Sequence, residues 1–375
     1  MRGSMARLAA CLLTMVAVAA CSSSKTTTTP TKDAGTDTPA ADTVLTDVVK
    51  PDVPVADVPP DIAPDLAVTD VPGDVSAVQG PVARGSYLVK FVMACGDCHT
   101  PRMPDGSPDM TKQLAGVPAM FDLAPTDPSV GAIGTPNLTP DKTTGLGNWT
   151  DDQIKTALTT GMDDKGKPLF PIMPYWLYHN LTADDANAIV AYLRTLPAVA
   201  NAIPERQPLG FPFTVAAQPL GMDQMPLSSV KAGEPAFAQS QNGRYLVAVA
   251  GCVDCHTAPS AAGVPLPVDV TRILAGNRDF PASEFGLPTP PFPVHIFSAN
   301  LTPHANGIAG WTTTQIQTAL QKGLDKDGNK LCPPMPAGPK GPFAGMTDTD
   351  ALAIGTYLLT IPPVDTGKID PCKAP

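Results

Sequence analysis

Charge, aromatic side chains and long apolar runs are all scarce in this sequence. Charged residues make up 16% and aromatic residues 5% of its 375 residues. No apolar run reaches the ~18 residues of a membrane-spanning helix, so no such helix is predicted. Lys and Arg number 25 against 35 Asp and Glu, which gives a net charge of −10. Because phosphate binding needs a basic face, this balance argues against nucleic acid as a partner.

Proline, in contrast, is abundant and unevenly spread. The chain has 45 prolines, more than twice the usual share of ~5%. Residues 21–80 consist mainly of Thr, Pro, Ala, Asp and Val and include no aromatic side chain. Such a segment cannot bury a core, and its acidic side chains repel one another, so it is predicted to be a disordered, extended tether. A passive solubilising spacer would have the same composition.

The first 20 residues have the pattern of an export signal. Arg2 and Arg7 precede an apolar run over residues 8–20, which is too short to span a membrane. The run ends in Val-Ala-Ala before Cys21, which resembles the cleavage site of bacterial lipoproteins. We therefore expect a signal peptide over 1–20, a lipid anchor on Cys21 and export to the periplasm or cell envelope, with Ser22 favouring the outer membrane. The alternative is an ordinary signal peptide followed by an incidental cysteine.

The rest of the sequence contains one pattern twice. Each copy has, in the same order, a Gly-x-Tyr-Leu-Val segment, a Cys-x-x-Cys-His-Thr motif, an Asn-Leu-Thr-Pro segment, a tryptophan and a Met-Pro pair. This repetition predicts two tandem domains over 81–203 and 239–369, joined by a Pro- and Gly-rich linker over 204–238.

Helix start and stop signals recur in both copies. Thr150 and Gln153 have the spacing of a capping box, and Gly161 marks the end of that helix. Corresponding caps and stops occur at Thr312, Gln315, Gly323, Thr182 and Thr347. A first helix is expected to run into each Cys-x-x-Cys-His motif, and no alternating strand pattern is evident. The predicted fold is therefore mainly α, with small, loop-rich helical domains that need a further group to complete their cores.

The two Cys-x-x-Cys-His motifs predict covalent haem attachment, with the cysteines bonded to the haem vinyl groups and the histidine on the iron. The residues concerned are Cys95, Cys98, His99, Cys252, Cys255 and His256. A redox-active dithiol would need a βαβ context, and a zinc site would need a second ligand pair at short spacing; the sequence indicates neither. Two covalently bound haem c groups are therefore the expected cofactors, each wrapped by one domain.

The repeat also selects the second iron ligand. Of the methionines and remaining histidines, only Met173 and Met335 occupy matched positions, and each precedes a proline. Histidine–methionine coordination raises the potential of haem iron and fills both axial positions, so it favours electron transfer over catalysis. The alternative is that both are ordinary core methionines.

Four further residues lie between the attachment motif and the methionine in the two copies. They are Asn137, Trp149, Asn300 and Trp311. Their amide and indole N–H groups could donate hydrogen bonds to buried haem propionates. A purely structural role in loops and core is the alternative.

Two cysteines remain after the signal, the lipid anchor and the haem motifs are accounted for. Cys332 lies three residues before Met335, and Cys372 follows the last expected helix. Outside the cytoplasm such a pair predicts a disulfide. Closing its loop would stabilise the protein by roughly 3–4 kcal/mol in the chain-entropy model. Two separate thiols are the alternative.

The motifs together resemble a known family. The segments Cys-Gly-Asp-Cys-His-Thr, Asn-Leu-Thr-Pro-Asp, Met-Pro-Tyr and Ala-Tyr-Leu-Arg-Thr-Leu-Pro, with Leu-Gly-Phe-Pro-Phe in the linker, are similar to those of the multihaem cytochrome c subunits of bacterial membrane-bound alcohol and gluconate dehydrogenases. The resemblance covers residues 84–364. It implies class I cytochrome c domains that pass electrons from a dehydrogenase towards quinone or an oxidase.

The expected function is therefore electron transfer by a membrane-anchored dihaem c-type cytochrome. Its expected partners are a dehydrogenase or quinol-side donor and a downstream acceptor such as another cytochrome or an oxidase. We expect no substrate chemistry of its own. The main alternative is a dihaem peroxidase-like enzyme with one labile axial ligand, and a haem-based sensor is a third possibility.

Overall fold

The computed structural model describes residues 75–122, 131–205, 216–260, 267–282 and 289–367. These residues all belong to one compact unit. The signal peptide, Cys21, the tether up to residue 74 and Cys372 lie outside the described residues. We call residues 75–205 the first half and residues 216–367 the second half.

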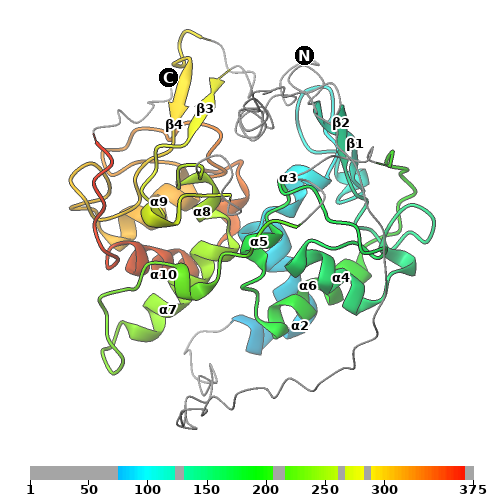
Figure 1. Ribbon diagram of the computed structural model, residues 1–375, viewed down its shortest axis with the longest axis horizontal. Helices are drawn as coiled ribbons and strands as arrows, with labels where there is room; N and C mark the ends of the chain where they lie inside the picture. The colour runs from blue at the N-terminus through cyan, green and yellow to red at the C-terminus, as the bar shows by residue number, and fades with distance from the viewer. Residues whose placement is uncertain (1–74, 123–130, 206–215, 261–266, 283–288, 368–375) are drawn as a thin grey trace, which may run out of the picture. The chain divides into compact units, whose positions relative to one another are not determined.

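Both halves are mainly helical, as the sequence predicts, and their elements follow nearly the same order (Figure 1). The first half contains α2 (Val75–Tyr87), η2 (Leu88–Val92), α3 (Cys95–His99), η3 (Met110–Lys112), β1 (Val117–Asp122), β2 (Ala132–Thr135), η4 (Leu146–Asn148), α4 (Asp151–Thr160), α5 (Tyr175–Tyr178) and α6 (Ala183–Thr195). The second half contains η5 (Met222–Gln224), α7 (Phe237–Val249), α8 (Cys252–Cys255), η6 (Val270–Arg272), β3 (Asp279–Pro281), β4 (His295–Phe297), α9 (Thr313–Lys322), η8 (Pro342–Gly345) and α10 (Asp348–Leu358). The domain boundaries stay predictions.

Two short antiparallel strand pairs were not expected from the sequence. Strand β1 pairs with β2, with Val117 opposite Thr135, and β3 pairs with β4, with Asp279 opposite Phe297. Strands of three to six residues are too short to establish an alternating pattern of polar and apolar side chains.

The folded part begins earlier than expected, because α2 starts at Val75, within the segment predicted to be disordered. This helix is interrupted at Gly80, where φ is +77°. Only glycine adopts such an angle readily, and Pro81 then opens the second helical stretch with its φ already suited to a helix. The predicted start at residue 81 therefore coincides with the break inside α2.

The predicted helix caps are confirmed. Thr150 and Gln153 form a capping box at α4, and Thr312 and Gln315 form one at α9. The two helices end at glycines in the left-handed region, Gly161 and Gly323. At the last helix of each half the hydroxyl of Thr182 or Thr347 accepts from the backbone N–H three residues later.

The first helix of each half stops just before the Cys-x-x-Cys-His motif and does not run into it. A residue in the left-handed conformation separates the two, Ala94 with φ +52° and Gly251 with φ +73°. The first half has one residue more than the second between its Gly-x-Tyr segment and its first motif cysteine. The extra residue coincides with η2, a π-helical turn, which is how a helix absorbs a single insertion.

In each half, the first helix crosses the last helix at a very short distance between backbones. A Cβ atom on Gly85 would lie 1.8 Å from the carbonyl oxygen of Ala188 in α6, and one on Gly243 would lie 1.9 Å from that of Ala353 in α10. Tyr192 and Tyr357, which follow on the last helices, are buried beside these crossings. Only glycine permits backbones to approach so closely.

One hydrophobic core runs through both halves. Its largest fully buried side chains include Tyr175 and Trp176 of the first half and Tyr357 of the second. Among the described residues, no helix combines the length and the apolar character needed to cross a bilayer.

Candidate haem sites

The first Cys-x-x-Cys-His motif forms the short helix α3 and buries its histidine. His99 is 5% exposed, and its Nδ1 lies 2.9 Å from the carbonyl oxygen of Pro136. A carbonyl only accepts, so Nδ1 carries the proton and Nε2 keeps its lone pair. Burial lowers the pKa of His99, which favours the neutral imidazole. A neutral ring with one nitrogen fixed by the backbone is the form that binds a metal through the other nitrogen.

The second motif repeats this geometry on α8. His256 is 8% exposed, and its Nδ1 lies 2.8 Å from the carbonyl oxygen of Ala299. Burial lowers the pKa of this imidazole too. Pro136 and Ala299 occupy the same place in the two copies, one residue before the asparagine of Asn-Leu-Thr-Pro. The repeated sequence therefore holds both imidazoles in one tautomer.

A glycine packs against the chain segment that carries each accepting carbonyl. The sequence alone did not single out these two glycines. The N–H of Gly116 donates to the carbonyl of His99, and that of Gly276 donates to the carbonyl of His256, each at 2.7 Å. A Cβ on Gly116 would lie 2.8 Å from the carbonyl carbon of Pro136. Both glycines have positive φ, +84° and +74°. The signal available in the sequence was the Leu-Ala-Gly triplet that follows each motif and ends in these glycines.

The four motif cysteines are free thiols and do not form disulfides. Burial raises the pKa of Cys95 and Cys252 to about 12. Burial likewise raises the pKa of Cys255 to about 12. A redox-active dithiol usually has a lowered thiol pKa, so the raised values give no support to that alternative.

The residues present fit a covalently bound haem. Each motif offers two unpaired thiols on one short helix and, directly after them, a neutral imidazole with its Nε2 nitrogen uncommitted. Thioether bonds and one axial imidazole are what a c-type haem requires.

The two methionines lie in equivalent turns before a proline. The N–H of Met173 donates to the carbonyl of Phe170 at 3.1 Å, and that of Met335 donates to the carbonyl of Cys332 at 3.3 Å. Both side chains are half-buried and pack against the core. Their ligation of iron stays a prediction.

The two asparagines expected near propionates are committed to the protein. Asn137 donates through Nδ2 to the carbonyl of Val199 at 2.8 Å and to the hydroxyl of Thr144 at 3.1 Å. Asn300 donates in the same way to the carbonyl of Val364 at 2.8 Å. These contacts tie each Asn-Leu-Thr-Pro segment to the chain after the last helix, and they favour the structural alternative. Trp149 and Trp311 are half-buried against the core, and their propionate role stays a prediction.

Only one of the two cysteines of the predicted disulfide lies among the described residues. Cys332 is half-buried and does not belong to the free thiols of the described residues, whereas Cys372 lies outside these residues. Their pairing stays a prediction.

A mainly helical fold with two buried, backbone-fixed imidazoles after paired cysteines has the features of a c-type haem protein. Comparison with known proteins identifies its relatives. The chain is 30% identical over 294 residues to the fructose dehydrogenase cytochrome subunit of Gluconobacter japonicus, an alignment that covers 76% of this chain and 54% of the relative. It is 28% identical over 298 residues to a diheme cytochrome c-type of Cereibacter sphaeroides, covering 77% of this chain and 89% of the relative.

A third relative is the cytochrome c subunit of alcohol dehydrogenase (quinone) from Komagataeibacter europaeus, at 30% identity over 63% of this chain and 49% of the relative. The chain thus spans about half the length of the dehydrogenase subunits and most of the diheme protein. No family model matches the chain. The resemblance expected from the motifs is confirmed, because this chain is a homologue of the cytochrome c subunits of bacterial dehydrogenases.

Proposed function

We propose that this chain is a dihaem c-type cytochrome that carries electrons from a dehydrogenase or quinol-side donor to a downstream acceptor. The observation that carries the proposal is the repeated motif geometry, in which His99 and His256 each donate Nδ1–H to a backbone carbonyl at the same place in the repeat. The diheme relative, which matches over most of its own length, supports the number two.

In this proposal the four motif cysteines hold the haems, and His99 and His256 bind the irons. Met173 and Met335 supply the second axial ligands, and the indoles of Trp149 and Trp311 donate to propionates. The bound haem supplies one-electron redox chemistry. Soft, neutral methionine sulfur favours the reduced iron, and the resulting positive potential suits an electron carrier.

The export signal and Cys21 would attach the proposed cytochrome to the cell envelope through a lipid anchor, at the outer membrane. Residues 21–74 would then serve as a tether between the anchor and the folded unit. A dehydrogenase is the proposed electron donor, because several relatives are subunits of such enzymes. Another cytochrome or an oxidase is the proposed acceptor.

Haem content tests the first part of the proposal. Protein denatured in acidified organic solvent should keep both haems covalently attached. The double variant Cys95→Ala with Cys98→Ala should lose one haem, and Cys252→Ala with Cys255→Ala should lose the other. Release of the haem from the unaltered protein into the solvent would contradict covalent attachment.

Near-infrared absorption tests the methionine ligands. The oxidised protein should show the weak sulfur-to-iron band, and Met173→Ala and Met335→Ala should each remove about half of it. Met162→Leu is a matched control, because the second copy has Leu324 at that position. A full band in both alanine variants would eliminate these residues as ligands.

A further inference from the structure

Two tyrosines exchange hydrogen bonds between the halves in a reciprocal way. The hydroxyl of Tyr87 in the first half donates to Asp350 in the second at 2.6 Å. The hydroxyl of Tyr245 in the second half donates to Asp185 in the first, also at 2.6 Å. The two tyrosines are equivalent in the repeat, and so are the two aspartates. We call these two pairs the Tyr–Asp clasp.

The clasp completes the N-terminus of a helix in the opposite half. Asp350 is the third residue of α10, where a capping-box residue would bond back to the backbone N–H of Thr347. In this structure the Thr347 N–H instead donates to the Tyr87 hydroxyl at 3.1 Å. One hydroxyl therefore satisfies the helix amide and binds the carboxylate, and both aspartates are buried, at 6% exposure for Asp185 and 5% for Asp350.

The two ends of the clasp differ in charge. Arg84 forms a bidentate ion pair with Asp185, with both nitrogen–oxygen distances at 2.8 Å. The equivalent residue in the second half is Asn242, which donates to Asp350 at 3.1 Å. Burial opposes the charge on Arg84, but its bonds to Asp185 and the nearby Asp350 raise its pKa. The guanidinium of Arg84 thus bonds one buried carboxylate and lies near the charge of the other, and a charge-assisted pair such as Arg84–Asp185 is among the stronger hydrogen bonds in proteins.

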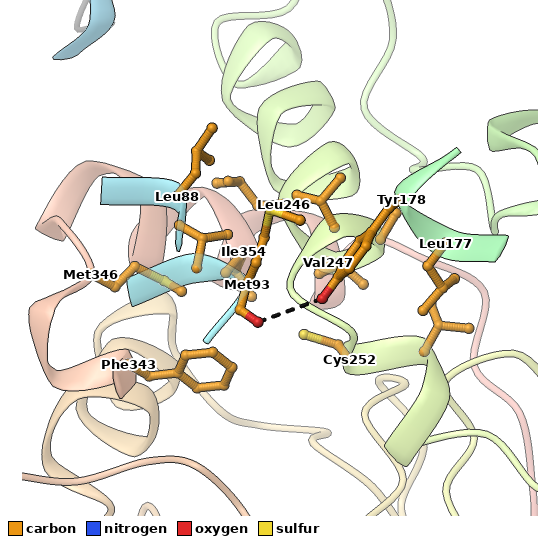
Figure 2. Close-up of a cluster of buried hydrophobic side chains, with 14 of the residues drawn as sticks. Leu88, Met93, Leu177, Tyr178, Leu246, Val247, Cys252, Phe343, Met346 and Ile354 are labelled. Carbon is orange, nitrogen blue, oxygen red and sulfur yellow. Dashed lines mark hydrogen bonds between the residues drawn. The ribbon is translucent and has the colours of Figure 1, made fainter. Parts of the chain in front are cut away.

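The same interface brings the two Cys-x-x-Cys-His segments to a shared buried cluster (Figure 2). Met93, two residues before Cys95, lies in this cluster, and its carbonyl accepts a hydrogen bond from Tyr178 at 3.5 Å. Cys252 of the second motif belongs to the same cluster. A close contact between the ring of Phe91 and Gly345 adds to this junction of the halves.

We propose that the Tyr–Asp clasp fixes the separation and orientation of the two Cys-x-x-Cys-His segments, so that electrons are exchanged between the two haems within one molecule. This inference rests on the proposed dihaem function. Tyr87, Tyr245 and their aspartate partners are positioning residues, because their hydrogen bonds join the two halves and, among the described residues, involve none of those expected to bind haem. The exchange moves one electron from a ferrous to a ferric iron and needs no further reactant.

The test compares the holoprotein with the double variant Tyr87→Phe and Tyr245→Phe, which keeps both rings and removes both hydroxyls. Pulsed dipolar electron paramagnetic resonance on the fully oxidised protein gives the distribution of iron–iron distances. Flash reduction of one haem gives the rate of re-equilibration with the other. Tyr357→Phe is the matched control, because its hydroxyl donates at 2.7 Å to Pro226 within the second half. Each lost hydrogen bond to a carboxylate should shift the equilibrium between clasped and unclasped halves by about tenfold towards the unclasped arrangement.

We expect the double variant to keep two haems with unchanged ligand bands, to show a broadened distance distribution and to re-equilibrate at least several-fold more slowly. Tyr357→Phe should match the unaltered protein in both measurements. Unchanged distances and rates in the double variant would overturn the inference. If the double variant does not load haem, the single variants Tyr87→Phe and Tyr245→Phe decide on the same criteria. Fewer than two haems in the unaltered protein would instead refute the proposed function.

Discussion

The substitution Gly116→Ala tests how the chain places the imidazole of His99. Gly116 has φ +84°, and a Cβ there would lie 2.6 Å from the carbonyl oxygen of Thr135 and 2.8 Å from the backbone nitrogen of Asn137. These are backbone atoms, so the segment that carries the Pro136 carbonyl must move. The hydrogen bond from His99 Nδ1 to that carbonyl, now 2.9 Å, would be stretched or lost.

Gly106→Ala is a matched control for the backbone cost. Gly106 has φ +87°, and a Cβ there would have no heavy atom within 4 Å. Alanine in the left-handed region costs about 1–2 kcal/mol at either site. At Gly116 the overpacking adds about 1–3 kcal/mol. We therefore expect about 1–2 kcal/mol of destabilisation for Gly106→Ala and about 2–5 kcal/mol for Gly116→Ala.

Guanidinium chloride unfolding of the holoproteins measures both costs, and redox titration reports the first haem. Only Gly116→Ala should also shift the midpoint potential of that haem, because the bond to Nδ1 tunes the basicity of the iron ligand. Equal unfolding free energies for the two variants, with an unchanged potential, would refute the close-approach argument.

Three further predictions concern local features. Thr150→Ala and Thr312→Ala should each lower the unfolding free energy by about 1 kcal/mol in urea titrations, because each removes the cap of a capping box. Intact mass with and without reduction should show that Cys332 and Cys372 form a disulfide, whereas two alkylatable thiols without reductant would disprove it. Hydrogen bonds from the hydroxyl and N–H of Thr144 lower the pKa of Asp141, so its stabilisation is complete above the ordinary pKa of an aspartate and is lost as the pH falls through the lowered value. Asp141→Asn should therefore flatten the acid side of the stability–pH curve. An unchanged acid side would show that Asp141 does not contribute to the pH dependence of stability.

The features that the sequence predicted well are local ones. The caps at Thr150 and Thr312 depend on residues three positions apart, so their spacing alone predicts them. The motif also singled out His99 and His256, which the structure buries and bonds to backbone carbonyls, while their binding of iron stays a prediction. The mainly helical class followed from these local signals.

The features that the sequence missed depend on distant residues. The matched positions of Tyr87 and Tyr245 in the two copies predict packing between first and last helices, and the structure adds that each hydroxyl bonds the last helix of the other copy. A repeat comparison shows equivalent positions but does not show which copy a side chain contacts. The carbonyls of Pro136 and Ala299 were missed because a backbone group leaves no signature in the side-chain pattern.

The shared helix caps have a consequence for the order in which the chain matures. The partner of Asp185 is Tyr245, 60 residues further along the chain. When the first half has been synthesised, the N-terminus of α6 therefore still lacks the hydroxyl that completes it. The first half should therefore be less stable alone than within the finished chain. A gene truncated after residue 205 should yield a product more sensitive to proteases than the same residues in the whole protein.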